Sequence, residues 1–162
     1  MVVYFTDERT ESRAFVTRIL QEVYRLPAPQ FLRGEHGKPR LVGAPLCFNL
    51  SHTHGRTFAV FSAQDVGLDA EWCARPLPKA CLARLTAAER QENFFRLWTA
   101  KEAYIKYRGG TLAAMLPALR FEGGRLMEGE IPVDAHLAFA EADGFCIALC
   151  TPAPAVIELK RI

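Results

Sequence analysis

The chain has 162 residues, of which half are hydrophobic and 23% are charged, proportions that suit one compact domain rather than a fibre or a disordered tail. The net charge of +2 is too small to indicate a nucleic-acid-binding protein, although it is compatible with a local basic pocket for a small anion. The sequence has neither a signal-peptide pattern nor an apolar run of about 18 residues, so we expect no contact with a membrane.

The cysteines indicate a reducing compartment. They number five, and none forms a C-x-x-C pair with another. We therefore expect a cytoplasmic protein with free thiols and without structural zinc.

The N-terminal segment predicts a strand followed by a helix. Val2–Phe5 is rich in β-branched and aromatic residues, which is typical of a strand. Apolar side chains then recur at helical spacing within Phe15–Val23, and Thr6 is the expected N-cap of this helix. Pro27 is expected to end it.

Three short apolar runs follow. Leu46–Leu50, Thr57–Ser62 and Val66–Glu71 each suit a buried strand. Gln64 and Asp65 separate the last two, which we expect to pair as a hairpin.

The C-terminal half predicts helices and then strands. Short helices are expected at Lys79–Leu85 and Thr86–Asn93, and a longer one at Phe94–Tyr107 ends at Gly109. Strands are expected at Ala118–Glu122, Arg125–Met127, Ala135–Glu141 and Phe145–Thr151, with an edge strand at Ala155–Leu159. Each half thus combines a helix with antiparallel strands, which predicts an α+β fold with two similar small lobes in a single domain, 1–65 and 66–162.

Two carboxylates are expected on one strand face. Asp69 and Glu71 are two residues apart in Gly67-Leu68-Asp69-Ala70-Glu71, and such residues point the same way on a strand. A hard cation such as Mg²⁺ relieves the repulsion between adjacent carboxylates. The alternative is a strand end that enters solvent, where acidic residues are common.

A third carboxylate lies on the predicted long helix. Trp98, Glu102 and Lys106 are four residues apart and share one face. A carboxylate beside a tryptophan on a core-facing stripe indicates that a charged group meets it. The alternative is a solvated Glu–Lys pair, which explains the two charges but not their alignment with Trp98.

Two further segments suit anion binding. Phe48-Asn49-Leu50-Ser51-His52 brings an apolar strand to a hydroxyl and an imidazole, and Lys38 stands between two turn residues in Gly37-Lys38-Pro39. His36 and His54 are expected to be ordinary surface residues.

Glu89 has two interpretations, a capping box with Thr86 or a general base.

Taken together, the segments NLSH, GLDAE and WTAKEAYIK, in this order, resemble the Sfp-type 4′-phosphopantetheinyl transferases, in their W/KEA branch. The similarity covers roughly residues 35–112. It implies a pseudo-twofold α+β fold that binds coenzyme A between two lobes and modifies an acyl or peptidyl carrier protein of fatty-acid, polyketide or nonribosomal-peptide biosynthesis. No nucleic-acid partner is expected, and a monomer is expected to suffice.

The resemblance also implies roles for individual residues. Asp69, Glu71 and Glu102 would bind Mg²⁺, and Lys106 would contact the pyrophosphate of coenzyme A. The other expected coenzyme A contacts are Lys38, Ser51, His52 and Lys101. Glu89, Lys106 and Glu102 form the expected catalytic set, in which Glu89 or a metal-bound water accepts the proton of the carrier serine. Arg75 and Arg108 are expected at the rim that meets the acidic carrier.

Three alternatives stay open. The chain has only one strand and one helix before Gly37, fewer than many members of the family, which is compatible with a non-catalytic module that binds coenzyme A or a carrier protein. The D-x-E and K-E pattern is also loosely similar to magnesium-dependent nucleases or phosphodiesterases, although the low net charge and the NLSH segment argue against this class. The third alternative is a domain whose acidic residues are only capped and solvated.

Overall fold

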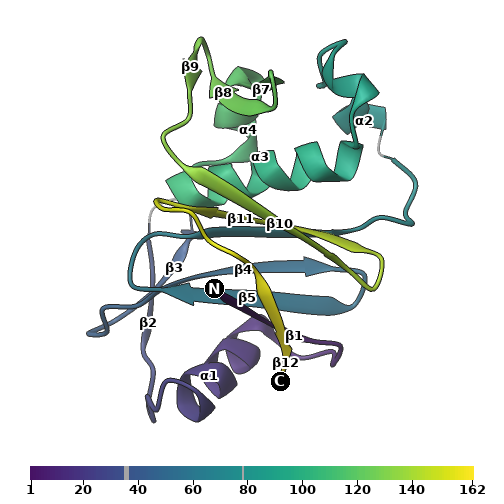
Figure 1. Cartoon of the computed structure of the whole chain (residues 1–162). Coiled ribbons are helices and arrows are strands. Elements are labelled where there is room, and N and C mark those ends of the chain that lie inside the picture. Colours follow the sequence, from purple (N-terminus) through teal and green to yellow (C-terminus); the bar gives the residue numbers. More distant parts are fainter. Residues whose placement is uncertain (35–36, 78) are drawn as a thin grey trace.

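The computed structural model describes residues 1–34, 37–77 and 79–162, so the expectation for His36 lies outside the described residues. The chain forms layers (Figure 1): helix α1 covers one sheet, this sheet packs on a second sheet, and helix α3 covers the far face of the second sheet. The class is α+β, as predicted. No helix in the described part of the chain is long and apolar enough to cross a membrane.

The first sheet has four strands in the order β12-β1-β5-β4. They are β1 (Val2–Thr6), β4 (Cys47–Thr53), β5 (Arg56–Ser62) and β12 (Glu158–Arg161). Helix α1 (Ser12–Glu22) buries Phe15, Ile19 and Leu20 against Phe48 and Phe61 of this sheet. The apolar repeat seen in the sequence is therefore the face by which α1 joins the core.

The second sheet has three antiparallel strands in the order β10-β11-β6: β6 (Gly67–Trp72), β10 (His136–Ala142) and β11 (Phe145–Thr151). Every residue of β11 is buried, because one face packs on the first sheet and the other on α3 (Phe94–Arg108). Asn93 caps the start of α3 by accepting hydrogen bonds from the amides of Phe95 and Arg96, and Gly109, in the left-handed conformation, caps its end.

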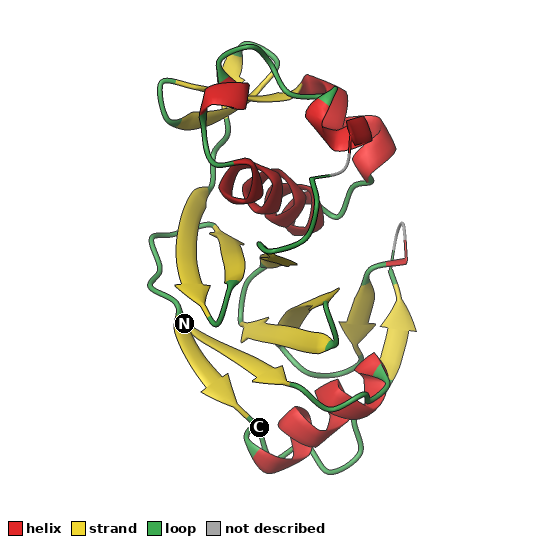
Figure 2. Cartoon of the chain, turned by 90° about the vertical axis from the view of Figure 1, so that its right-hand side faces the viewer, coloured by secondary structure: helices red, strands yellow, loops and turns green. Residues whose placement is uncertain are grey.

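The remaining elements are short. A two-stranded sheet pairs β2 (Phe31–Arg33) with β3 (Pro39–Leu41), and a three-stranded sheet orders β7 (Leu119–Glu122), β8 (Arg125–Glu128) and β9 (Ile131–Pro132). The short helices are α2 (Lys79–Leu82), η2 (Glu89–Gln91), α4 (Leu112–Met115) and η3 (Leu116–Ala118). Figure 2 shows that β7, β8 and these helices lie beyond α3, on the side opposite α1.

Two predictions of local structure are wrong. Strands β5 and β6 do not pair with each other: β5 lies between β1 and β4, and β6 pairs with β11. The hairpin is instead β4–β5, whose tight turn at His54 and Gly55 has positive φ at both residues. Thr6 does not cap α1, because it is the last residue of β1 and its hydroxyl accepts a hydrogen bond from the amide of Glu8.

The two large sheets are also joined at one end by Arg56, at the start of β5. Its guanidinium lies between the rings of Phe5 and Phe145, 4.7 and 4.6 Å from their centroids. It pairs with Asp7 at 2.5 Å and with Asp143 at 2.9 Å, and its side chain is only 13% exposed. Arg56 therefore connects the end of β1 to the β10–β11 turn.

Candidate active site

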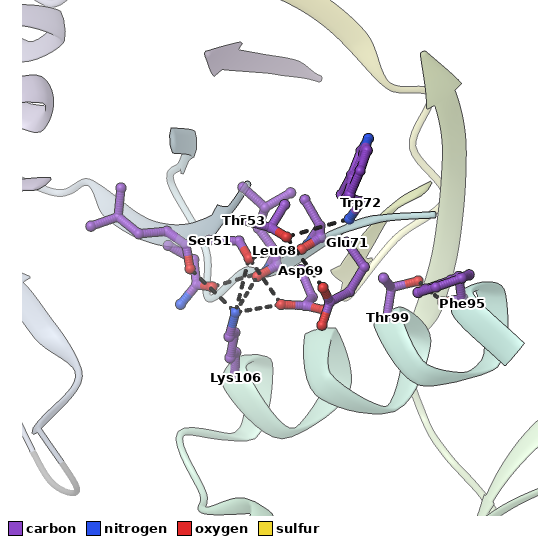
Figure 3. A network of polar contacts seen from close by, with 12 residues as sticks. Ser51, Thr53, Leu68, Asp69, Glu71, Trp72, Phe95, Thr99 and Lys106 are labelled. Carbon is purple, nitrogen blue, oxygen red and sulfur yellow. Dashed lines mark hydrogen bonds and ion pairs between the residues drawn. The ribbon is translucent and has the colours of Figure 1, made fainter. Parts of the chain in front are cut away.

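The edge strands of the two large sheets face each other, and side chains rather than a backbone ladder connect them. Asn49, Ser51 and Thr53 alternate along β4, and their oxygens accept hydrogen bonds from the amides of Leu68, Ala70 and Trp72 in β6, at 3.0, 3.1 and 3.3 Å. Part of this contact is visible in Figure 3. We call these three side chains the β4–β6 seam. The polar alternation within NLSHT is the sequence signal for it, and sequence reasoning missed Asn49 and Thr53.

Glycine 67 brings β6 against α3. A Cβ at this position would overlap the carbonyl oxygen of Ala103 and would lie 2.5 Å from the amide nitrogen of Tyr107. Only a residue without a side chain allows the strand to approach the helix backbone this closely. This close contact determines the distance between the backbones of α3 and β6.

The three carboxylates singled out in the sequence come together at this crossing. One oxygen of each of Asp69, Glu71 and Glu102 lies within 4.8 Å of the others. Asp69 is 3% exposed, and its Oδ2 atom is buried without a hydrogen-bond partner among residues 1–34, 37–77 and 79–162. We call these residues the carboxylate trio.

Burial and mutual repulsion change the acidity of the trio. Burial, and then the neighbouring carboxylate of Asp69, raise the pKa of Glu102 to about 7. Burial also raises the pKa of Asp69, although Lys106 and the hydroxyl of Ser51 oppose the rise. Such a cluster favours a cation, because a positive charge removes the repulsion between the carboxylates.

Lys106 reaches the trio from α3 (Figure 3). Its Nζ lies 2.7 Å from Oδ1 of Asp69 and donates to the carbonyl oxygen of Leu68 at 3.1 Å. Ser51 donates to the same Asp69 oxygen at 2.9 Å. The side chain of Lys106 keeps 29% exposure, so it touches solvent as well as the trio.

The expected coenzyme A contacts do not all gather here. His52 is exposed at the rim of a shallow depression of about 500 Å³ between the β4–β5 turn and the residues that precede α1. Its ring is hydrogen-bonded to Ser12, and partial desolvation by the surrounding chain, followed by the charge of Lys106, lowers its pKa. Lys38 instead lies at the C-terminal end of α3, where it donates to the carbonyl of Tyr107 at 3.4 Å.

Glu89 and Lys101 form a separate buried pair. The Nζ of Lys101 lies 2.6 Å from Oε1 of Glu89, and each side chain is 1% exposed. Glu89 also accepts hydrogen bonds from the amides of Thr86 and Phe121 at 2.9 and 2.8 Å. The amide of Glu89 in turn donates to the hydroxyl of Thr86 at 3.2 Å, so the capping box is present.

This pair does not fit two of the sequence expectations. Contact of Lys101 with coenzyme A requires an accessible ammonium, but this one is enclosed and already paired. Burial raises the pKa of Glu89, but the hydrogen bonds of Lys101, Thr86 and Phe121 outweigh it and lower the pKa below the ordinary value. A carboxylate with three donors and a low pKa is a poor general base.

The two arginines expected at the carrier rim have partners within the chain. Arg75 pairs with Glu71 of the trio at 2.7 Å, and Arg108 pairs with Glu128 at 3.0 Å. Arg108 is half exposed, whereas the Arg75 side chain is 28% exposed. Arg75 thus belongs to the candidate site rather than only to its rim.

Comparison with known proteins finds similarity to one family. Residues 65–150 match the model of the 4′-phosphopantetheinyl transferase superfamily. The chain is 33% identical to the 4′-phosphopantetheinyl transferase AcpT of Salmonella typhimurium, over 90% of this chain and 79% of that protein. It is 31% identical to psf-1 of Bacillus pumilus, over 91% and 72%, and 27% identical to Sfp of Bacillus subtilis, over 86% and 71%, both also named 4′-phosphopantetheinyl transferases.

Proposed function

Because this chain belongs to the 4′-phosphopantetheinyl transferase superfamily, we propose that it transfers the 4′-phosphopantetheine group of coenzyme A to a serine of an apo carrier protein and releases 3′,5′-ADP. The observation that carries the proposal is the carboxylate trio at the crossing of β6 and α3. The trio lies within the matched residues 65–150.

The residues present fit a magnesium ion. Mg²⁺ prefers oxygen ligands and commonly takes one or two carboxylates together with substrate phosphates. The trio offers carboxylate oxygens alone, and the buried Oδ2 atom of Asp69 lacks a partner among the described residues. Asp69, Glu71 and Glu102 would hold the ion, which, when bound, would neutralise charge on the phosphate oxygens.

The chain's own groups would then position coenzyme A for transfer. In the reaction the serine oxygen bonds to the β-phosphorus, the bond from this phosphorus to the bridging oxygen breaks, 3′,5′-ADP leaves, and the serine proton passes to water. Lys106, partly exposed beside Asp69, would offset the charge that gathers on the departing phosphate. His52, at the rim of its depression, would contact the 3′-phosphate end. Lys38, which directly precedes β3, and Ser51, on β4, would help His52 to hold this end of coenzyme A.

Glu89 and Lys101 would act by position. Their pair ties the segment before α3 to the helix that carries Glu102 and Lys106. We propose that the pair fixes the height and rotation of α3, so that Glu102 stays opposite Asp69. In this proposal neither residue touches substrate.

The two-lobe description also belongs to the proposal. Residues 1–65 and 66–162 would form two lobes of one domain related by a pseudo-twofold axis, with coenzyme A bound between them. In support, each half packs one long helix on an antiparallel sheet, α1 on β4–β5 and α3 on β10–β11. The last strand, β12, returns to the sheet of β1. A monomer in the cytoplasm is proposed, in keeping with five free thiols.

Mass spectrometry of apo carrier proteins tests the function. Acyl and peptidyl carriers are incubated with this protein, coenzyme A and Mg²⁺, with and without chelator. We expect a gain of one phosphopantetheine group per carrier, lost with chelator and in Glu102→Gln. Glu130→Gln is the matched control, because the Glu130 side chain is 90% exposed.

Two results would contradict the proposal. Transfer by Glu102→Gln at the parental rate would reject the metal assignment. Coenzyme A binding without modification of any carrier would favour the non-catalytic module.

A further inference from the structure

Two of the three carboxylates in the trio already have a cation from the chain. The Nζ of Lys106 lies 2.7 Å from Asp69 Oδ1, and Nη2 of Arg75 lies 2.7 Å from Glu71 Oε1. The cations approach from different elements, since Lys106 is on α3 and Arg75 follows β6. Each therefore occupies an oxygen of a residue that would bind the metal.

Arg75, which is partly exposed, makes few polar contacts for an arginine in a candidate site. Besides the contact with Glu71, its guanidinium lies 5.6 Å from the centroid of the Phe95 ring. Its Nε is buried without a hydrogen-bond partner in the described ranges, which omit only 35, 36 and 78. A guanidinium has five N–H donors, and Arg75 uses one of them in the contacts that the structure records. The side chain thus sits in the site with unused donor capacity.

The charges at the site favour joint binding of a metal and a phosphate. When all three carboxylates are ionised, as metal binding requires, the trio and the two cations together carry one negative charge. A bound divalent cation would make this net charge positive. The negative charge of a pyrophosphate would then compensate the positive charge. A metal ion that binds the Glu71 carboxylate must either displace the Arg75 guanidinium from it or share the carboxylate with that guanidinium.

We propose that Arg75 competes with the metal for Glu71 and, once displaced, contacts the phosphates of coenzyme A, so that the metal and coenzyme A each strengthen the binding of the other. This inference rests on the proposed function. It assigns to Arg75 a positioning role that the sequence pattern did not indicate. The guanidinium suits it, because it forms bidentate contacts with carboxylates and phosphates alike.

Isothermal titration with MgCl₂ tests the inference without any reaction. Parental protein, Arg75→Gln and Arg75→Lys are titrated with and without coenzyme A, and Mg²⁺ binding to coenzyme A alone is subtracted. Arg125→Gln is the control, because this exposed arginine lies on β8. Thermal unfolding establishes that each variant is folded.

Without coenzyme A, we expect Arg75→Gln to bind Mg²⁺ about threefold or more tightly than the parent, the scale of a partly exposed ion pair. We also expect coenzyme A to improve Mg²⁺ affinity less in Arg75→Gln than in the parent. Arg75→Lys should lie between them, and Arg125→Gln should match the parent.

Equal or weaker Mg²⁺ binding by folded Arg75→Gln would overturn the inference, as would an undiminished effect of coenzyme A. If Arg75→Gln does not fold, Arg75→Lys decides by the same comparisons. Absence of Mg²⁺ binding in the parent would overturn the metal site of the proposed function together with the inference. The two failures are therefore distinguishable.

Discussion

Replacing Lys101 with methionine tests whether the buried Glu89–Lys101 pair supports the fold. Both side chains are 1% exposed and their charged atoms lie 2.6 Å apart, so the change leaves a buried carboxylate without its cation. Breaking a buried ion pair from one side costs about 3–5 kcal/mol. Glu89 would keep the amide hydrogen bonds of Thr86 and Phe121, so we expect about 3 kcal/mol, at the lower end of this range.

The assay is urea unfolding of the parent, Lys101→Met, Glu89→Gln and the double variant, together with the coenzyme A affinity of each. At this chain length the loss corresponds to a fall in Tm of roughly 10 °C. The double variant should be more stable than the sum of the single changes implies, because it removes both buried charges. A loss below about 1 kcal/mol, with weakened coenzyme A binding, would refute the reasoning and make Lys101 a ligand contact.

The pH dependence of stability provides a second test of the Glu89–Lys101 pair. The folded protein lowers the pKa of Glu89 below its ordinary value of 4.5, so the carboxylate binds its proton less readily when folded. The stability from Glu89 is therefore complete above pH 4.5 and is lost as the pH falls through the lower folded value. The stability difference between parent and Lys101→Met should narrow over this range, and a constant difference would contradict the assignment.

Three further predictions concern stability and reactivity. Gly67→Ala should cost about 2–4 kcal/mol in urea unfolding and weaken Mg²⁺ binding, because its Cβ pushes α3 away from β6; parental stability would contradict this. Arg56→Met should cost about 1–2 kcal/mol in the same assay, through loss of two ring contacts and two ion pairs, and an unchanged midpoint would reject the role of Arg56 in joining the sheets. Burial raises the pKa of Cys146 to about 11 and of Cys150 to about 12. Neither thiol should therefore react with iodoacetamide near pH 8 until urea unfolds the chain. Peptide mass spectrometry measures the alkylation, and alkylation of the folded protein at either cysteine would contradict their burial.

Local signals in the sequence were sufficient to predict most of the elements. Helix α3 could be located because its helical spacing and the glycine that follows it, Gly109, are local signals. Asn93 was expected to end the preceding short helix, whereas the structure makes it the N-cap of α3. The spacing of Asp69 and Glu71 likewise predicted one shared face, and the structure brings Glu102 to the same place. The helix and the shared strand face depend on residues close together in the chain, whereas the approach of Glu102 to them is a long-range contact.

Long-range pairing could not be predicted in the same way. Strands β5 and β6 are adjacent in sequence and both apolar, which suggested a hairpin, but their partners are β1, β4 and β11. Lys101 is next to Glu102 in the chain, yet it points to Glu89 because helical neighbours lie about 100° apart. The strand pairing of β5 and β6 and the Glu89–Lys101 contact depend on the tertiary structure, which local sequence patterns do not specify.

The pairing of β12 with β1 has a consequence for how the chain folds. The two strands run parallel, and the register joins Val2 to Glu158 and Phe5 to Arg161, so β1 receives one of its neighbours from a strand that is synthesised much later (Figure 1). During synthesis this edge of β1 stays open, and an unpaired strand edge can pair with other chains. Closure across such a sequence separation is slow compared with local hairpin formation. A nascent chain that stalls before Glu158 should therefore be more prone to aggregate than a chain that includes β12.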